Sequence, residues 1–173
     1  HLGDIFHVEM FKGYYARPKN EWRSNKGISG GIFYDWGAHY IDYLLGVVPG
    51  KVSKVKGVIH NRVWHDVTNE DQMDSFLTFD SGTVAHIQIS TIAHAPKPVY
   101  RFCGTKGTVV VEELKSKELT LYTSWNGLKT ETKVTCLESR AESFYRNIAA
   151  HLLHGEELAV KPEEARRTIA IIE

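Results

Sequence analysis

Two aspartates and a histidine recur at helical spacing in the stretch GGIFYDWGAHYIDYLLGVVPG, residues 30–50. At about 100° per residue, Asp35, His39 and Asp42 lie at relative angles of about 0°, 40° and 340°, on one narrow stripe of a helix. A carboxylate one turn from an imidazole can orient the ring and stabilise its protonated form. His39 could therefore serve as a general base, with Asp35 as its partner. A structural pair, in which an aspartate near a helix start simply hydrogen-bonds to the histidine, explains the spacing equally well.

The helix that would carry this stripe is predicted over residues 35–45. It is bounded by glycine and proline signals: Gly30 and Gly31 before it, and Gly46, Pro49 and Gly50 after it. Apolar and aromatic residues occupy most of the remaining circumference, so the helix should be largely buried and its polar stripe should face a polar space such as a cleft.

The rest of the chain predicts a sheet that supports this helix. Alternation with period two predicts strands over residues 4–11 and 52–59, and three hairpins are predicted to turn at residues 80–82, 104–107 and 126–127. Two more helices are expected, one over residues 139–155 with a capping box between Ser139 and Glu142, and one from Pro162 to the end. The predicted fold class is α+β, with an open, mainly antiparallel sheet of at least five strands and helices on one face.

Length and composition indicate a single domain spanning residues 1–173. Lys and Arg number 21, Asp and Glu also number 21, and no basic run occurs, so a nucleic-acid partner is not expected. No apolar stretch approaches the roughly 20 residues of a membrane span, so no membrane partner is expected either. Cys103 and Cys136 have no C-x-x-C spacing, which favours free thiols in a cytoplasmic setting, and the other histidines show no metal-ligand spacing.

Both ends look cut, because the chain begins inside a predicted strand and stops inside an apolar helical pattern. We therefore expect a fragment of a longer polypeptide.

Several motifs together resemble the C-terminal domain of the Gfo/Idh/MocA oxidoreductases, the family of glucose-fructose oxidoreductase and inositol dehydrogenase. The core of the resemblance is Gly30-Gly31 followed by Asp35-x-x-x-His39-x-x-Asp42 and Gly46. Trp22-Arg23, the hairpin FDSGTVAHIQIS, the turn GTKGTV and the tail FYRNIAAHLLHGEELAVKPEEARRTIAII are similar to that family in order and spacing. The resemblance covers nearly the whole chain.

The resemblance implies roles for five side chains. His39 would be the general base that takes a hydroxyl proton while hydride leaves the same carbon for a nicotinamide, and Asp35 would orient its ring. Arg23 would hold substrate hydroxyls or a carboxylate, and Trp22 would offer a stacking wall. For these two, a structural salt bridge and core packing are equal alternatives. Asp42 would bind substrate directly or support its neighbours. Directly after Asp35, the sequence departs from the family pattern at Trp36, whose bulk would narrow or reshape the pocket.

The resemblance also implies NAD or NADP in the full-length protein, bound by an N-terminal Rossmann domain. This sequence shows no G-x-G-x-x-G after a strand, and the segments GTKG and GISGG lack a βαβ context. The family's Glu-Lys-Pro lysine does not occur here either. The fragment alone is therefore expected to bind no cofactor and to be inactive, and the open sheet face is expected to form a homo-dimer or tetramer.

The sequence leaves three possible functions for the chain. The first is the catalytic half of an NAD(P)-dependent oxidoreductase acting on a polyhydroxylated small molecule such as a sugar or inositol. The second is a non-catalytic binding or oligomerisation domain of the same fold, which the intact Asp35 and His39 argue against. The third is an NAD-dependent glycosidase, which shares the same motif.

Overall fold

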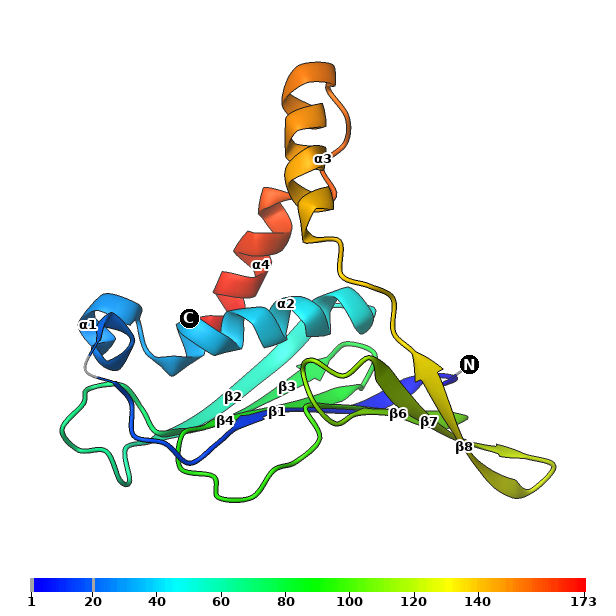
Figure 1. Ribbon diagram of the computed structural model, residues 1–173, viewed down its shortest axis with the longest axis horizontal. Helices are drawn as coiled ribbons and strands as arrows, with labels where there is room; N and C mark the ends of the chain where they lie inside the picture. The colour runs from blue at the N-terminus through cyan, green and yellow to red at the C-terminus, as the bar shows by residue number, and fades with distance from the viewer. Residues whose placement is uncertain (1, 20) are drawn as a thin grey trace.

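The computed structural model describes residues 2–19 and 21–173, which form an open eight-stranded sheet with helices above one face (Figure 1). The strand order is β2-β3-β4-β1-β5-β6-β7-β8. The strands are β1 (Ile5–Gly13), β2 (Val52–His60), β3 (Gln72–Phe79), β4 (Val84–Ser90), β5 (Tyr100–Gly104), β6 (Gly107–Val111), β7 (Glu118–Trp125) and β8 (Leu128–Thr135). Strands β1 and β4 run parallel, and the other neighbouring pairs are antiparallel.

The predicted α+β class and mainly antiparallel sheet are confirmed. The three predicted hairpins are β3–β4, β5–β6 and β7–β8, each closed at the turn that its glycines indicated. The central position of β1, between β4 and β5, joins segments far apart in the chain. It places the first strand in the middle of the sheet, where both of its edges are paired.

The hydrophobic core lies between the central strands and helix α2 (Ala38–Val47). Alternate residues of each strand face this helix, as expected for a pleated sheet. On β4 these are Ala85, Ile87 and Ile89, the face that the alternation predicted, and all three are buried. From the helix, Ile41 and Leu44 complete the same cluster. The apolar side of the helix thus meets the apolar side of the sheet.

The other helical elements lie on the same side of the sheet as α2 (Figure 1). They are the short turn η1 (Trp22–Ser24), α1 (Lys26–Ser29), the π-helical turn η2 (Phe33–Gly37) that leads into α2, and α4 (Pro162–Ile172), which packs against α2 and η2. The final helix begins at Pro162 as predicted.

Helix α3 (Ala141–His154) differs from the expectation in two ways. Its N-cap is Arg140, so Glu142 occupies the second helical position instead of the third, and the predicted capping box with Ser139 does not form. The helix also projects away from the sheet (Figure 1), and its apolar residues Phe144 and Leu152 are exposed. Helical periodicity correctly predicted the helix but not the burial of its apolar side.

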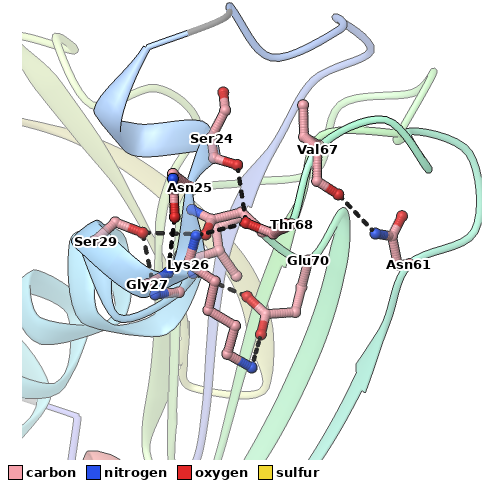
Figure 2. Close-up of polar contacts among 12 residues, drawn as sticks. Ser24, Asn25, Lys26, Gly27, Ser29, Asn61, Val67, Thr68 and Glu70 are labelled. Carbon is pink, nitrogen blue, oxygen red and sulfur yellow. Dashed lines mark hydrogen bonds and ion pairs between the residues drawn. The ribbon is translucent and has the colours of Figure 1, made fainter.

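The connection between β2 and β3, residues 61–71, holds η1 and α1 in place (Figure 2). The backbone N–H of Thr68 donates to the carbonyl of Ser24 over 3.1 Å, and Thr68 Oγ1 accepts from the N–H of Lys26 over 2.8 Å. The connection therefore satisfies donors and acceptors that such short helical pieces leave unpaired.

Glu70 extends the same connection to the segment that leads into the candidate site (Figure 2). Its largely buried carboxylate accepts from Lys26 Nζ over 2.6 Å and from the backbone N–H of Ile32 over 3.1 Å. Gly31, with φ of +109°, lies against it, and a Cβ there would come within 3.0 Å of Glu70 Oε2. A side chain at position 31 would therefore be strained and would crowd the carboxylate.

Asp71 fixes the other half of the connection. It is fully buried, and its Oδ2 accepts from the backbone N–H groups of Arg62, Val63 and Trp64 over 2.7, 2.6 and 3.2 Å. Burial raises the pKa of this carboxyl, but the three N–H donors outweigh burial and the pKa lies below its usual value. The connection is thus anchored by two neighbouring carboxylates.

Two further observations concern the cysteines and the helices. Cys103 is buried and Cys136 is partly exposed, and both are free thiols, as predicted. None of the helices in the described part of the chain has the length and apolar character needed to cross a membrane.

Replacing Leu44 with alanine should lower the free energy of unfolding by about 2–5 kcal/mol, because Leu44 is 0% exposed and its loss leaves a cavity. Leu152→Ala is the matched control, because Leu152 on α3 is 77% exposed and should change stability by less than about 0.5 kcal/mol. Urea unfolding of the three proteins measures both values. Equal losses would show that α3, and not only α2, is buried in solution.

Glu70→Gln should destabilise the fold by about 1.5–3 kcal/mol near neutral pH, the usual contribution of hydrogen bonds to a charged group. Burial raises the pKa of Glu70, but the bonds from Lys26 and from backbone N–H groups outweigh it, and the pKa lies below its usual value. Since the folded-state pKa is depressed, the stabilisation is full above the unfolded pKa of about 4.3 and is lost as the pH falls through the folded value.

Urea unfolding as a function of pH tests this sign. The difference between the wild type and Glu70→Gln should shrink as the pH falls below about 4.3. Glu138→Gln serves as the control, because Glu138 is exposed and should show no such trend. A difference that stays constant down to pH 3 would contradict the assignment.

Candidate functional site

The helix that carries the predicted motif is not a uniform α-helix. A regular helix from Asp35 to Leu45 was expected, but the helical backbone begins at Phe33 and ends at Val47, and its first turn, η2, is π-helical. The prediction of the helix is therefore right and its boundaries and first turn are wrong. In this turn the N–H of Ala38 donates to the carbonyl of Phe33, five residues back.

The π turn alters the geometry of the predicted stripe. An i→i+5 turn rotates less per residue than an α turn, so Asp35 is displaced from the line through His39 and Asp42. Gly37 permits the turn, because a Cβ at that position would collide with the ring of Phe33. Such π bulges within helices are frequent at functional sites.

Asp35 pairs with Arg23. The guanidinium Nε of Arg23 donates to Asp35 Oδ2 over 3.2 Å, and the carboxylate is mostly buried while the arginine is about half exposed. In the described part of the chain, no hydrogen bond joins Asp35 to His39. The expected orientation of the imidazole by this carboxylate is therefore not seen, and the structure instead shows the salt bridge that was one of the alternatives for Arg23.

The position of Arg23 is set by the β2–β3 connection. The side-chain amide of Asn69 donates to the carbonyl of Arg23, and Asn69 Oδ1 accepts from Ser29 Oγ over 3.0 Å. Asn69 is itself buried, so this contact is held away from water. The residue that pairs with Asp35 is thus fixed by a side chain more than 40 residues away in sequence.

Arg23 and Asp35 line one hollow of about 270 Å³, together with Tyr14 and Trp36. Of the residues expected at the site, the structure brings these two together. Trp22 does not line this hollow: it is exposed, and the Arg23 guanidinium lies 4.2 Å from its ring centroid.

His39 is exposed on the surface of α2, and the indole of Trp36 lies between it and this hollow. Its imidazole centroid lies 6.1 Å from that of Trp36, with the planes tilted by 58°. It is not sealed among the apolar residues of α2, so solvent can reach it. Trp36 connects the imidazole with the hollow that contains Asp35 and Arg23.

Asp42 lies apart from the other predicted residues. It is exposed and lines a separate shallow hollow with Tyr43, Tyr100 and Phe102, toward the other end of α2. The structure therefore does not bring Asp42 together with Arg23 and Asp35.

Two residues that the sequence did not single out lie at the hollow or beside it: Lys12 of β1, and Tyr14, which directly follows the end of β1 at Gly13. Tyr14 lines the hollow, and burial together with the nearby Asp35 charge raises the pKa of its phenol. The ammonium of Lys12 lies 4.3 Å from the ring centroid of Trp36 and 5.6 Å from that of Tyr14. The sequence did contain a signal for these two residues. A lysine and a tyrosine take the next alternate positions after the buried Val8 and Met10.

The described residues do not fit a dinucleotide. The segment Gly104 to Gly107 is the hairpin turn between β5 and β6, and Gly27 to Gly31 spans the four-residue helix α1 and the approach to η2. Neither provides a helix N-terminus preceded by a strand and a glycine-rich turn, which is what a pyrophosphate requires. Residues 2–19 and 21–173 also contain no group of three metal-ligating side chains.

Comparison with known proteins identifies the fold. The sequence model of the GFO/IDH/MocA C-terminal domain matches residues 1–110. A search of curated proteins finds no match. Among solved structures, YvaA from Bacillus subtilis is 20% identical with a TM-score of 0.87, covering 99% of this chain and 55% of that protein.

Two other solved structures agree. An NAD-binding protein from Listeria innocua is 24% identical with a TM-score of 0.80, covering 99% of this chain and 56% of that protein. An oxidoreductase from Bacillus cereus is 19% identical with a TM-score of 0.77, covering 97% of this chain and 63% of that protein. The chain spans little more than half the length of these structures, and identities this low establish the shared fold alone. With the match over residues 1–110, the resemblance seen in the motifs is confirmed: the chain belongs to the GFO/IDH/MocA family and corresponds to its C-terminal domain.

Proposed function

We propose that this chain is the substrate-binding and catalytic half of an NAD(P)-dependent oxidoreductase that oxidises a hydroxyl group of a sugar, inositol or related polyol. The observation that supports this most is an exposed histidine beside a polar hollow, at the start of the helix that carries the family motif. A π-helical turn leads into this helix, and such turns are frequent at functional sites.

His39 acts as the general base in this proposal. A neutral imidazole has one unprotonated ring nitrogen, which can accept a proton. When an alcohol is oxidised, its hydroxyl proton passes to the His39 ring and hydride leaves the same carbon. The bound nicotinamide supplies the hydride acceptor.

Asp35 and Arg23 shape the substrate side. The Arg23 Nε is engaged by Asp35, and the outer nitrogens of the guanidinium would donate to substrate oxygens. Trp22, stacked on the same guanidinium, extends this surface. Asp42 lines a separate hollow and contacts the substrate only if the substrate is long. Asp35 thus orients Arg23 directly.

NAD or NADP is assigned to the full-length protein. Because the described residues offer no cradle for the pyrophosphate, the cofactor would be held by polypeptide outside these 173 residues. Titration of the chain with reduced nicotinamide, followed by fluorescence, would reveal any binding.

His39→Ala in the full-length protein should lower kcat by about 10²-fold or more, the usual contribution of a positioned general base. His154→Ala is the control, because that exposed histidine ends α3 and should leave kcat unchanged. Rates are measured by nicotinamide absorbance with polyol substrates. An unimpaired His39→Ala enzyme would favour the assembly domain, whereas cleavage of a glycoside by the wild type would favour the NAD-dependent glycosidase.

The sheet face opposite the helices is proposed to bind a second copy of the chain. Paired positions across four strands carry Phe76, His86, Glu9 and Arg101 on this face. Phe76 stacks on His86 with ring centroids 4.4 Å apart, and Arg101 pairs with Glu9 over 2.8 Å. An exposed aromatic among ordered charged pairs has the mixed character of a protein interface.

Phe76→Arg should therefore convert the assembly to monomers, because it places an unpaired charge at the centre of the joined faces. Leu152→Arg on α3 tests the alternative apolar surface and should leave the assembly intact. Light scattering at micromolar concentration gives the mass of each protein. A monomeric wild type, or dissociation by Leu152→Arg alone, would rule out the sheet-face interface.

A further inference from the structure

Lys12 occupies a position that a buried apolar residue would be expected to fill. It is paired in register with Ile89 of β4, which is paired with Met73 of β3, and both partners are about 1% exposed. The preceding residues on the same face of β1, Val8 and Met10, are equally buried. A lysine at such a position is the informative exception to the rule that core-facing positions are apolar.

Lys12 is only partly buried, and none of the described protein groups pairs with its ammonium. Its nitrogen lies over the rings of Trp36 and Tyr14, and no ion pair or hydrogen bond to this side chain is found within the described part of the chain. Aromatic faces attract a cation by roughly 0.5–2 kcal/mol, but they neither neutralise it nor replace the acceptors that its three N–H donors require. The two rings thus hold the ammonium in place but leave its N–H donors without a protein acceptor among the described residues.

Two of the three cations that line the hollow are already paired, and the third is Lys19. Arg17 pairs with Asp66, and Arg23 pairs with Asp35. On the far side of Glu70, Lys26 is paired as well. Lys12 is nevertheless the cation whose ammonium lies over the Trp36 ring, and no carboxylate of the described residues pairs with it there.

Trp36 connects Lys12 to the candidate catalytic base. The indole contacts the ammonium on one side, lies 6.1 Å from the His39 ring, and lines the hollow of Asp35 and Arg23. A molecule whose anionic group lies against Lys12 would therefore need to extend only past the Trp36 ring to reach His39.

We propose that Lys12 binds a carboxylate or phosphate group of the substrate, so that the substrate is an acidic polyol and not a neutral one. This rests on the proposed function and specifies its substrate class. Tyr14 and Trp36 hold the ammonium in place, and the ammonium selects for the anionic substituent. Lys12 is a specificity residue in this assignment and takes no part in proton transfer.

Calorimetric binding tests the proposal without requiring turnover. The full-length protein with oxidised nicotinamide cofactor is titrated with D-glucose, D-glucuronate and D-glucose 6-phosphate, which separate a neutral, a carboxylate and a phosphate ligand. The wild type should bind at least one of the two anionic ligands about tenfold or more tightly than glucose. The anionic ligand that binds more tightly shows whether the site prefers a carboxylate or a phosphate. Lys12→Met should reduce this preference to within about threefold, and Lys12→Arg should retain part of it.

Controls separate the possible failures. Lys117→Met removes an exposed lysine of the loop before β7 and should leave the preference unchanged, and thermal unfolding shows that each variant is folded. A wild type that binds no anionic ligand more tightly than glucose, or a Lys12→Met variant that keeps the preference, would overturn the proposal. Tight anion binding without any nicotinamide reduction would instead contradict the proposed oxidoreductase and leave the Lys12 site standing.

Discussion

The geometry of the candidate site depends on one buried carboxylate, that of Glu70. It holds the ammonium of Lys26 and the backbone N–H of Ile32 at once, and so it joins the β2–β3 connection to the segment that begins the π turn. A largely buried carboxylate is stable only when it is paired and hydrogen-bonded, and both conditions are met here. Asn69 extends the same clamp to Arg23, the partner of Asp35. The clamp thus decides where the polar side chains of the site can lie.

Local signals made much of the fold predictable. The three hairpins could be predicted because each turn and its flanking alternation lie within about twenty residues, and the helices were recognisable from periodicity and from Pro162. The central place of β1 was not predictable in the same way, because its partners are residues 84–90 and 100–104 and no local pattern encodes that pairing. The exposure of α3 was also missed, since periodicity reports an apolar side without reporting what covers it.

The candidate site was predictable in its residues more than in its geometry. The motif pointed to Asp35 and His39, but the α-helical angles assumed for them do not apply across the π turn, which arises from Gly37 and the packing of Phe33. The pairing of Asp35 with Arg23 depends on a connection that reaches back from residues 68–70. Lys12 was overlooked because alternation marks a position as facing the core without indicating that its side chain lies over the rings of Trp36 and Tyr14.

The central claim is that substrate oxidation takes place at the exposed side of α2, between His39 and the hollow of Arg23 and Asp35. A crystal structure of the full-length protein with oxidised nicotinamide cofactor and a bound polyol tests it most directly. The account predicts a substrate hydroxyl oxygen within about 2.6–3.2 Å of a ring nitrogen of His39, the distance needed for proton transfer. A polyol bound elsewhere, with His39 facing only solvent, would contradict it.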